Sequence, residues 1–62
     1  KEEEERRYSS ALMRADKAVA DKKYDDAKSA YNEALSIHPE NEYAKKRLEI
    51  VSYQLEKEKL KN

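Results

Sequence analysis

The segment from residue 24 to residue 39 constrains the fold most, because small side chains recur in it at helical spacing. Alanine stands at Ala27, Ala30 and Ala34, in steps of three and four. Such steps place the small residues on one side of a helix, where a second helix can approach closely. Pro39 disfavours the helical conformation at the residue before it, so the helix is expected to end there. The segment is therefore predicted to be one half of a closely packed helix pair.

The rest of the chain has the same period. Apolar residues recur about every 3.6 positions, and the chain holds no glycine and one proline. This pattern predicts an all-α fold with helices over about 3–21, 24–37 and 42–60, with Asn41 as a favourable N-cap of the third. Short connections force neighbouring helices to run antiparallel. The residues expected to face the core are Tyr8, Ala11, Leu12, Ala15, Ala18, Val19, Ala27, Ala30, Tyr31, Ala34, Leu35, Ala44, Leu48, Val51 and Leu55.

The composition allows one domain with a small core. Of the 62 residues, 37% are hydrophobic and 45% are charged, so the chain has little apolar surface to bury. Lysine and arginine equal aspartate and glutamate at 14 each, which gives no net attraction to nucleic acid or to an anionic membrane. The longest apolar runs are three residues, too short to span a bilayer. Because the chain begins with Lys1 rather than Met, we expect a trimmed or processed fragment.

The sequence offers no constellation for catalysis or for metal binding. His38 is the only histidine and there is no cysteine, so a transition-metal site or an acid–base pair lacks partners. We interpret His38 as a cation near the negative end of a helix. The acidic runs at Glu2–Glu5 and Asp25–Asp26 suit helix starts, and no loop resembles a calcium site. We expect neither an enzyme nor a bound cofactor, and the redox compartment and cellular location stay open.

The tyrosines and the basic residues of the third predicted helix are the remaining candidates for contact sites. Tyr8, Tyr24 and Tyr31 fall at core or boundary positions, and we expect their hydroxyl groups to reach solvent. Tyr43 and Tyr53 fall on another side of the third helix, where surface contact and packing at the edge both remain open. Lysine and arginine alternate with glutamate along that helix, which is typical of a solvated face rather than a nucleic-acid interface.

The second predicted helix resembles the second helix of a tetratricopeptide repeat, a 34-residue helix-turn-helix unit. Ala27 and Tyr31 match the small residue and the aromatic four positions later, Ala34 matches the next alanine, and Pro39 the closing proline. Tyr24 fits the tyrosine that often opens this helix. The resemblance covers one repeat, about residues 8–41.

The first helix and the third depart from the family pattern. Arg14 stands at a leucine position, Ala18 at a tyrosine position, and Lys22 at the usual glycine before the second helix. Ala15 keeps the small residue that allows close approach. Glu49 stands where a small residue would admit a further helix. The resemblance therefore implies an antiparallel three-helix unit, in which one domain over 1–62 consists of a repeat and a capping helix over about 42–60.

The resemblance also implies a groove lined by the first helix of each pair. In this chain the groove would comprise Leu12, Asp16, Val19, Lys46, Ile50 and Tyr53. The family's clamp for peptide carboxylates has Lys and Asn at the positions of Leu12 and Asp16, which puts that ligand type in doubt. A mixed apolar groove would suit a partner helix or an extended peptide.

Three functions follow as hypotheses. The first is a non-catalytic protein–protein interaction or scaffold module that binds a protein, a peptide or another copy of itself. The second is a designed, reconstructed or excised repeat with no activity beyond folding or self-association. The third is a coiled-coil oligomeriser built on Leu48, Val51 and Leu55, although the heptad pattern breaks at Glu58. Because a single repeat cannot bury its apolar faces alone, we expect the third helix to cover it as a lid or the chains to associate.

Overall fold

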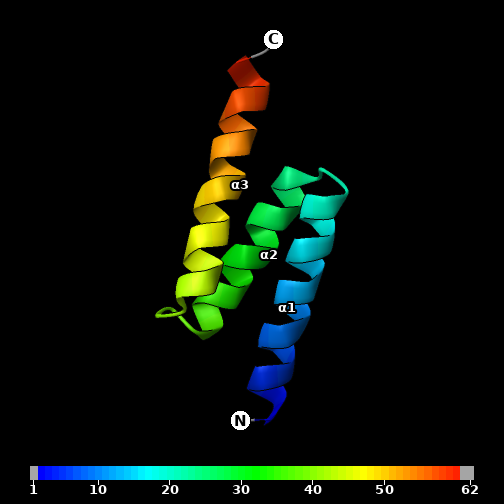
Figure 1. Ribbon diagram of the computed structural model, residues 1–62. Helices are drawn as coiled ribbons and strands as arrows, with labels where there is room; N and C mark the ends of the chain where they lie inside the picture. Colours follow the sequence, from blue (N-terminus) through cyan, green and yellow to red (C-terminus); the bar gives the residue numbers. More distant parts are fainter. Residues whose placement is uncertain (1, 61–62) are drawn as a thin grey trace.

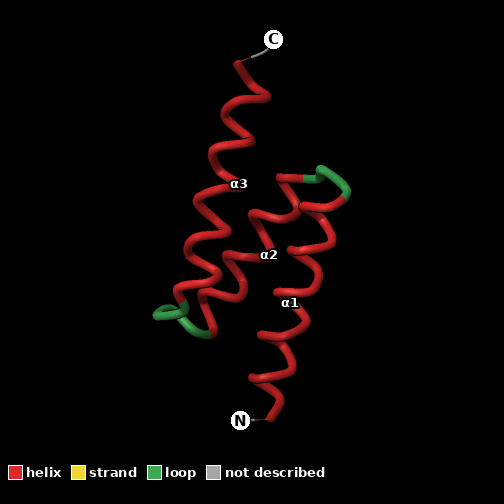
Figure 2. The backbone as a smooth tube through the Cα atoms, in the orientation of Figure 1, coloured by secondary structure: helices red, strands yellow, loops and turns green. Residues whose placement is uncertain are grey.

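The computed structural model describes residues 2–60, which form three helices joined by two short turns (Figure 1). Helix α1 spans Glu2–Ala20, α2 spans Tyr24–Ile37 and α3 spans Glu42–Leu60. The all-α prediction is confirmed, with α2 and α3 at the predicted bounds and α1 shifted by one residue at each end. The chain runs up α1, down α2 and up α3, with α2 between the other two helices (Figures 1 and 2).

The turn between α1 and α2 depends on an unusual backbone conformation at Lys22. This residue has φ 61°, in the left-handed region that favours glycine. The amide of Lys22 donates to the carbonyl of Val19 at 3.0 Å, and the amide of Lys23 donates to that of Ala18 at 2.7 Å. This pair of hydrogen bonds is the Schellman motif, which satisfies carbonyl groups at a helix end. Lys22 therefore occupies the position after the helix end that glycine most often takes in this motif.

The turn between α2 and α3 is closed by a side-chain cap. Oδ1 of Asn41 accepts a hydrogen bond from the amide of Ala44 at 2.9 Å, so the predicted N-cap is confirmed. At the end of α2 the amide of His38 still donates to the carbonyl of Ala34 at 2.9 Å. Pro39 follows at once and lies outside the helix, as its restricted backbone requires.

The fully buried side chains of α1 and α2 are almost all alanine, and larger side chains that are only partly buried pack against the same core: Tyr8, Leu12, Val19, Tyr24 and Leu35. Three alanines of α1 and three of α2 are buried there, and Tyr31 of α2 is the one large side chain that is fully buried among them. Alanine lets helix backbones approach closely but contributes little apolar area per residue. The buried residues of these two helices are Ala11, Ala15, Ala18, Ala27, Ala30, Tyr31 and Ala34.

Helix α3 packs chiefly against α2, and its contact with α1 is much smaller. Ala44 and Val51 are buried, while Leu48 and Leu55 are partly buried against the same core. The lid expected from the sequence therefore covers α2 rather than enclosing both helices. The C-terminal part of α3 projects past the end of α2 (Figure 1). Among residues 2–60, no helix has the combination of length and hydropathy that a bilayer-spanning segment needs.

Candidate functional site

A polar cluster on Asp16 links all three helices. Tyr31 of α2 donates a hydrogen bond from its hydroxyl group to Oδ1 of Asp16 on α1. Tyr43 of α3 places its hydroxyl group 3.2 Å from both carboxylate oxygens of Asp16. Arg47, also on α3, donates from Nε to the hydroxyl oxygen of Tyr31 at 3.2 Å, and its Nη2 lies 3.7 Å from Oδ1 of Asp16. Asp16 is therefore the point at which α1 and α3 meet.

Burial and hydrogen bonding change the acidity of this cluster. Burial raises the pKa of Tyr31 from 10.0 to about 12, and the hydrogen bond to Asp16 acts in the same direction. The hydrogen bond to Tyr31 raises the pKa of Arg47 above its ordinary value. The expectation that the Tyr31 hydroxyl reaches solvent is wrong, because the residue is fully buried and its hydroxyl group bonds to side chains of the two neighbouring helices.

Of the six residues expected to line a groove, the three on α1 are partly buried and the three on α3 are exposed. Leu12 and Val19 are partly buried against the core, and Asp16 belongs to the polar cluster. On α3 the other three, Lys46, Ile50 and Tyr53, are exposed. Ile50 retains 51% of its surface and Tyr53 retains 63%, so these large side chains are open to contact. Whether a partner uses any of the six stays a prediction.

The sequence did not predict that Tyr43 and Arg47 act together in this cluster. Tyr43 and Arg47 lie four positions apart and therefore share one face of α3. The guanidinium carbon of Arg47 lies 5.8 Å from the centre of the Tyr43 ring, which adds a cation–π contact between them. Their spacing could have indicated a common face, but their shared partner Asp16 comes from another helix and no local pattern indicates it.

A second cluster joins the end of α2 to the first half of α1. His38, the residue after α2, has Nε2 2.8 Å from Oε1 of Glu5. Its ring and the ring of Tyr8 form a T-shaped pair, with centroids 4.5 Å apart and planes at 82°. The helix-end position was expected from the sequence, whereas these two partners were not. Within residues 2–60 no group of three potential ligands is placed to hold a metal ion.

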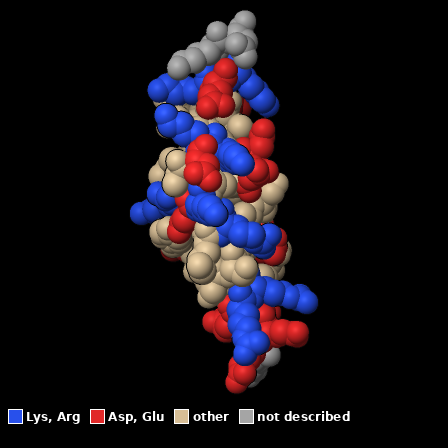
Figure 3. Space-filling view, turned by 90° about the vertical axis from the view of Figure 1, so that its right-hand side faces the viewer, with Lys and Arg blue, Asp and Glu red and all other residues tan. Residues whose placement is uncertain are grey.

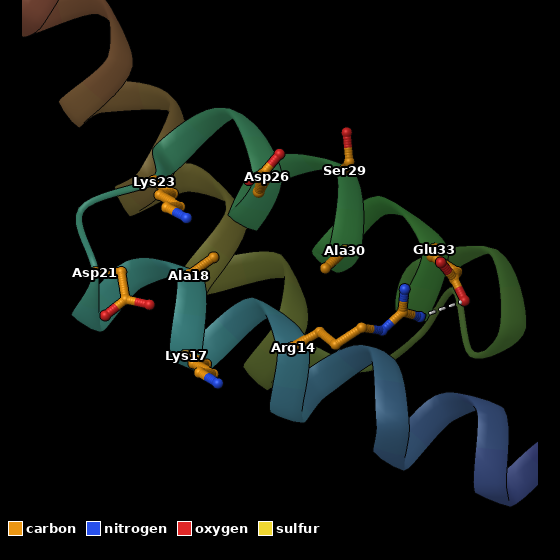
Figure 4. Close-up of a pocket in the computed structure, with 9 residues that line it drawn as sticks. All are labelled: Arg14, Lys17, Ala18, Asp21, Lys23, Asp26, Ser29, Ala30 and Glu33. Carbon is orange, nitrogen blue, oxygen red and sulfur yellow. Dashed lines mark hydrogen bonds and ion pairs between the residues drawn. The ribbon is translucent and has the colours of Figure 1, made fainter.

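A shallow hollow of about 440 Å³ lies between α1 and α2. Figure 4 shows Arg14 reaching across one end of it to Glu33, where Nη2 and Oε2 are 2.9 Å apart. Ala18 and Ala30 line it with small side chains, and the rest of its lining carries charges of both signs. Nothing in this set of residues favours one class of ligand. The lining residues are Arg14, Lys17, Ala18, Asp21, Lys23, Asp26, Ser29, Ala30 and Glu33.

The face on the α1 side of the molecule carries charges of both signs. In Figure 3 basic and acidic side chains are interspersed over this face, and neither sign forms a large separate area. Such a surface suits a solvated helix better than a polyanion-binding site. Ile50 and Tyr53 are both exposed and lie three positions apart, so the face of α3 that carries them is the candidate contact surface.

Comparison of the chain with protein-family models, with curated proteins and with solved structures finds no match.

Proposed function

We propose that this chain is a non-catalytic interaction module built on a tetratricopeptide-like helical hairpin and a capping helix. It would bind a protein or peptide on the side where α1 and α3 meet. The observation that carries the proposal is the pair of large, exposed apolar side chains on α3, Ile50 at 51% and Tyr53 at 63%. They lie on a helix whose other apolar stripe is already covered by α2. Because the two side chains lie three positions apart, they share one face of α3 and form a contiguous apolar surface, which favours a role in contact.

The tetratricopeptide-like assignment rests on residues of α2. Ala27, Tyr31 and Ala34 keep the family's small and aromatic positions, and all three are fully buried. Lys22 supports the same assignment, because it takes the left-handed conformation where the family usually has glycine. Both observations favour a single repeat followed by a capping helix.

The Asp16 cluster would give this surface a fixed geometry. Tyr43 and Arg47 hold α3 against α1 through one carboxylate, so the side chains on the same side of α3 keep a constant position relative to Leu12 and Val19. Preorganised surfaces lose less conformational entropy on binding. The cluster thus supports a positioning role rather than a chemical one.

The test is a selection of binders from a random peptide-display library, followed by NMR mapping of the selected peptides. Chemical-shift changes are expected at Leu12, Asp16, Val19, Lys46, Ile50 and Tyr53. Tyr53→Ala is expected to weaken binding about tenfold, which is a common effect of removing an aromatic contact. Met13→Ala is the matched control, because Met13 is also a large exposed apolar residue, at 73%, on another helix. Shifts confined to other surfaces would disprove the proposal.

Sedimentation equilibrium across concentration separates the remaining alternatives. A concentration-dependent dimer whose interface includes Ile50 and Tyr53 would identify the partner as a second copy. A monomer that selects no peptide at all would instead support a chain whose role ends at folding.

A further inference from the structure

Helix α3 carries a second regular stripe, on a side that α2 does not cover. Six positions recur in steps of three and four, and all of them are exposed. Tyr43 retains 48% of its surface and Leu60 retains 85%, beside the values already given for Ile50 and Tyr53. Steps of three and four are the heptad spacing by which one helix packs along another. We call Tyr43, Lys46, Ile50, Tyr53, Lys57 and Leu60 the outer stripe.

The charges of the outer stripe have one sign. Its two charged members are Lys46 and Lys57, and neither takes part in an ion pair found among residues 2–60. Nζ of Lys57 lies 5.7 Å from the centre of the Tyr53 ring, over an apolar member of the stripe. Arg47 borders the stripe, but Asp16 and Tyr31 already engage its guanidinium group. The stripe therefore offers apolar side chains with two unpaired cations among them.

Pairing of two copies through this stripe would bring like charges together. In an antiparallel helix pair centred between Ile50 and Tyr53, Lys46 of each copy lies opposite Lys57 of the other. In a parallel pair each lysine lies opposite the same lysine of the other copy. Like charges at directly opposed positions disfavour association. The stripe is thus apolar enough for a helix to dock on it, while its two lysines disfavour docking of the same stripe from a second copy.

We propose that the outer stripe binds an amphipathic helix of another protein, with carboxylates placed to meet Lys46 and Lys57. This inference rests on the proposed interaction function and adds the chemical class of the partner. The two lysines are eleven positions apart, about 16 Å along the helix. The partner therefore carries two acidic residues at about that separation, with apolar residues between and outside them.

The stripe leaves the direction of the partner helix open. From Tyr43 to Leu60 its members read apolar, basic, apolar, apolar, basic, apolar, and the spacing is the same in reverse. A partner with the complementary pattern would fit in either direction. Charge complementarity would then fix the register, because a shift by one heptad removes both lysine–carboxylate pairs.

A pair of synthetic 18-residue peptides tests the charge requirement. Both have leucine at positions 1, 8, 11 and 18 in an alanine- and glutamine-rich helical background; one has glutamate at positions 4 and 15 and the other has lysine. By fluorescence anisotropy at low salt, the glutamate peptide is expected to bind about tenfold more tightly, since two attractions replace two repulsions. The preference is expected to shrink at high salt. Equal affinities, or no binding of either peptide, would overturn the inference.

Matched charge reversals locate the effect on α3. Lys57→Glu is expected to remove the preference for the glutamate peptide, whereas Lys59→Glu keeps it. Both lysines are exposed and the net charge changes equally, but Lys59 lies on another side of the helix. Circular dichroism is the control that checks whether both variants remain folded. The same loss in the Lys59→Glu variant would indicate a general charge effect and would contradict the proposal.

A gain of self-association provides an independent check. In an antiparallel pair, Lys46→Glu would place a carboxylate opposite Lys57 of the second copy. This attraction would occur twice in each dimer. This variant is expected to dimerise in sedimentation at concentrations where the wild-type chain and Lys45→Glu remain monomeric. If the wild-type chain dimerises through the outer stripe, the inference is wrong. If both probe peptides shift Ile50 and Tyr53 equally, the charge requirement fails while the proposed interaction function stands.

Discussion

The two interfaces of α2 are built differently, although both belong to one small core. The fully buried side chains of α1 and α2 are alanines around a single tyrosine, with Leu12 and Val19 of α1 partly buried beside them. Helix α3 contributes the buried Ala44 and Val51 together with the partly buried Leu48 and Leu55. The first interface depends on close approach of two backbones, and the second on side-chain volume. Substitutions of opposite kinds are therefore expected to damage the two interfaces: added volume on the α1 side of α2, and lost volume on the α3 side.

Added volume at the α1–α2 interface is expected to have the largest effect. Ala15 is completely buried, so Ala15→Leu would force the helices apart and lower the free energy of unfolding by about 3 kcal/mol. Ala20→Leu is the control, because it adds the same volume at an exposed position of α1. Urea unfolding followed by circular dichroism measures both. A variant at position 15 as stable as its control would refute the close-approach account.

Lost volume at the α2–α3 interface comes next. Val51 is 2% exposed, and Val51→Ala is expected to lower the free energy of unfolding by about 2 kcal/mol through lost burial and a cavity. The neighbouring Ile50→Ala, at an exposed position, should change it by less than about 0.5 kcal/mol. Similar losses from the two variants would mean that α3 does not use its inner face as described.

The polar cluster connects the two interfaces and should contribute less than either. Tyr31→Phe removes the hydroxyl group that bonds Asp16 and Arg47, and is expected to cost about 1 kcal/mol in unfolding experiments. Tyr53→Phe removes an exposed hydroxyl group and is expected to cost almost nothing. No difference between the two variants would count against a stabilising role for the cluster.

The stabilising effect of the Tyr31 hydroxyl group is expected to depend on pH. Burial raises the pKa of Tyr31 from 10.0 to about 12, so the folded chain favours the neutral phenol. The stability that this group adds is complete below pH 10 and is lost as the pH rises through 12. The difference in unfolding free energy between the wild-type chain and Tyr31→Phe should therefore decline across that range. A constant difference would contradict the raised pKa.

The smallest expected effect is a gain at the turn that joins the two helices of the alanine interface. Lys22 has φ 61°, and Lys22→Gly is expected to raise the free energy of unfolding by about 0.5 kcal/mol, since relief of the left-handed strain exceeds the entropy lost by glycine. Lys23→Gly, at φ −94°, should instead destabilise the chain. Thermal melts of both variants decide the point.

The helices could be predicted from the sequence because their signals are local. The 3.6-residue period, the side chain of Asn41 and the position of Pro39 act within a few residues, and the bounds of all three helices agree with the structure to within one residue. Buried alanines at Ala27, Ala30 and Ala34 followed from the same spacing.

The candidate site could be predicted only in part, because its contacts cross between helices. The environment of Tyr31 was misjudged, since its hydroxyl partners come from α1 and α3. His38 was placed correctly at a helix end, but its bond to Glu5 spans 33 positions of sequence. The exposure of Ile50 and Tyr53 agrees with their expected position off the buried stripe of α3, and their use in binding stays a prediction.

The projection of α3 past the end of α2 has a consequence for backbone amide exchange. Residues 56–60 are all exposed, and their helix hydrogen bonds have no packed face to protect them. A helical end without tertiary support is only marginally stable in water. Deuterium should therefore enter this end of α3 first and reach the amides near Val51 last, so that one continuous helix displays a gradient of protection along its length. A partner helix docked on the outer stripe would flatten this gradient, because it would slow exchange where the free chain exchanges fastest.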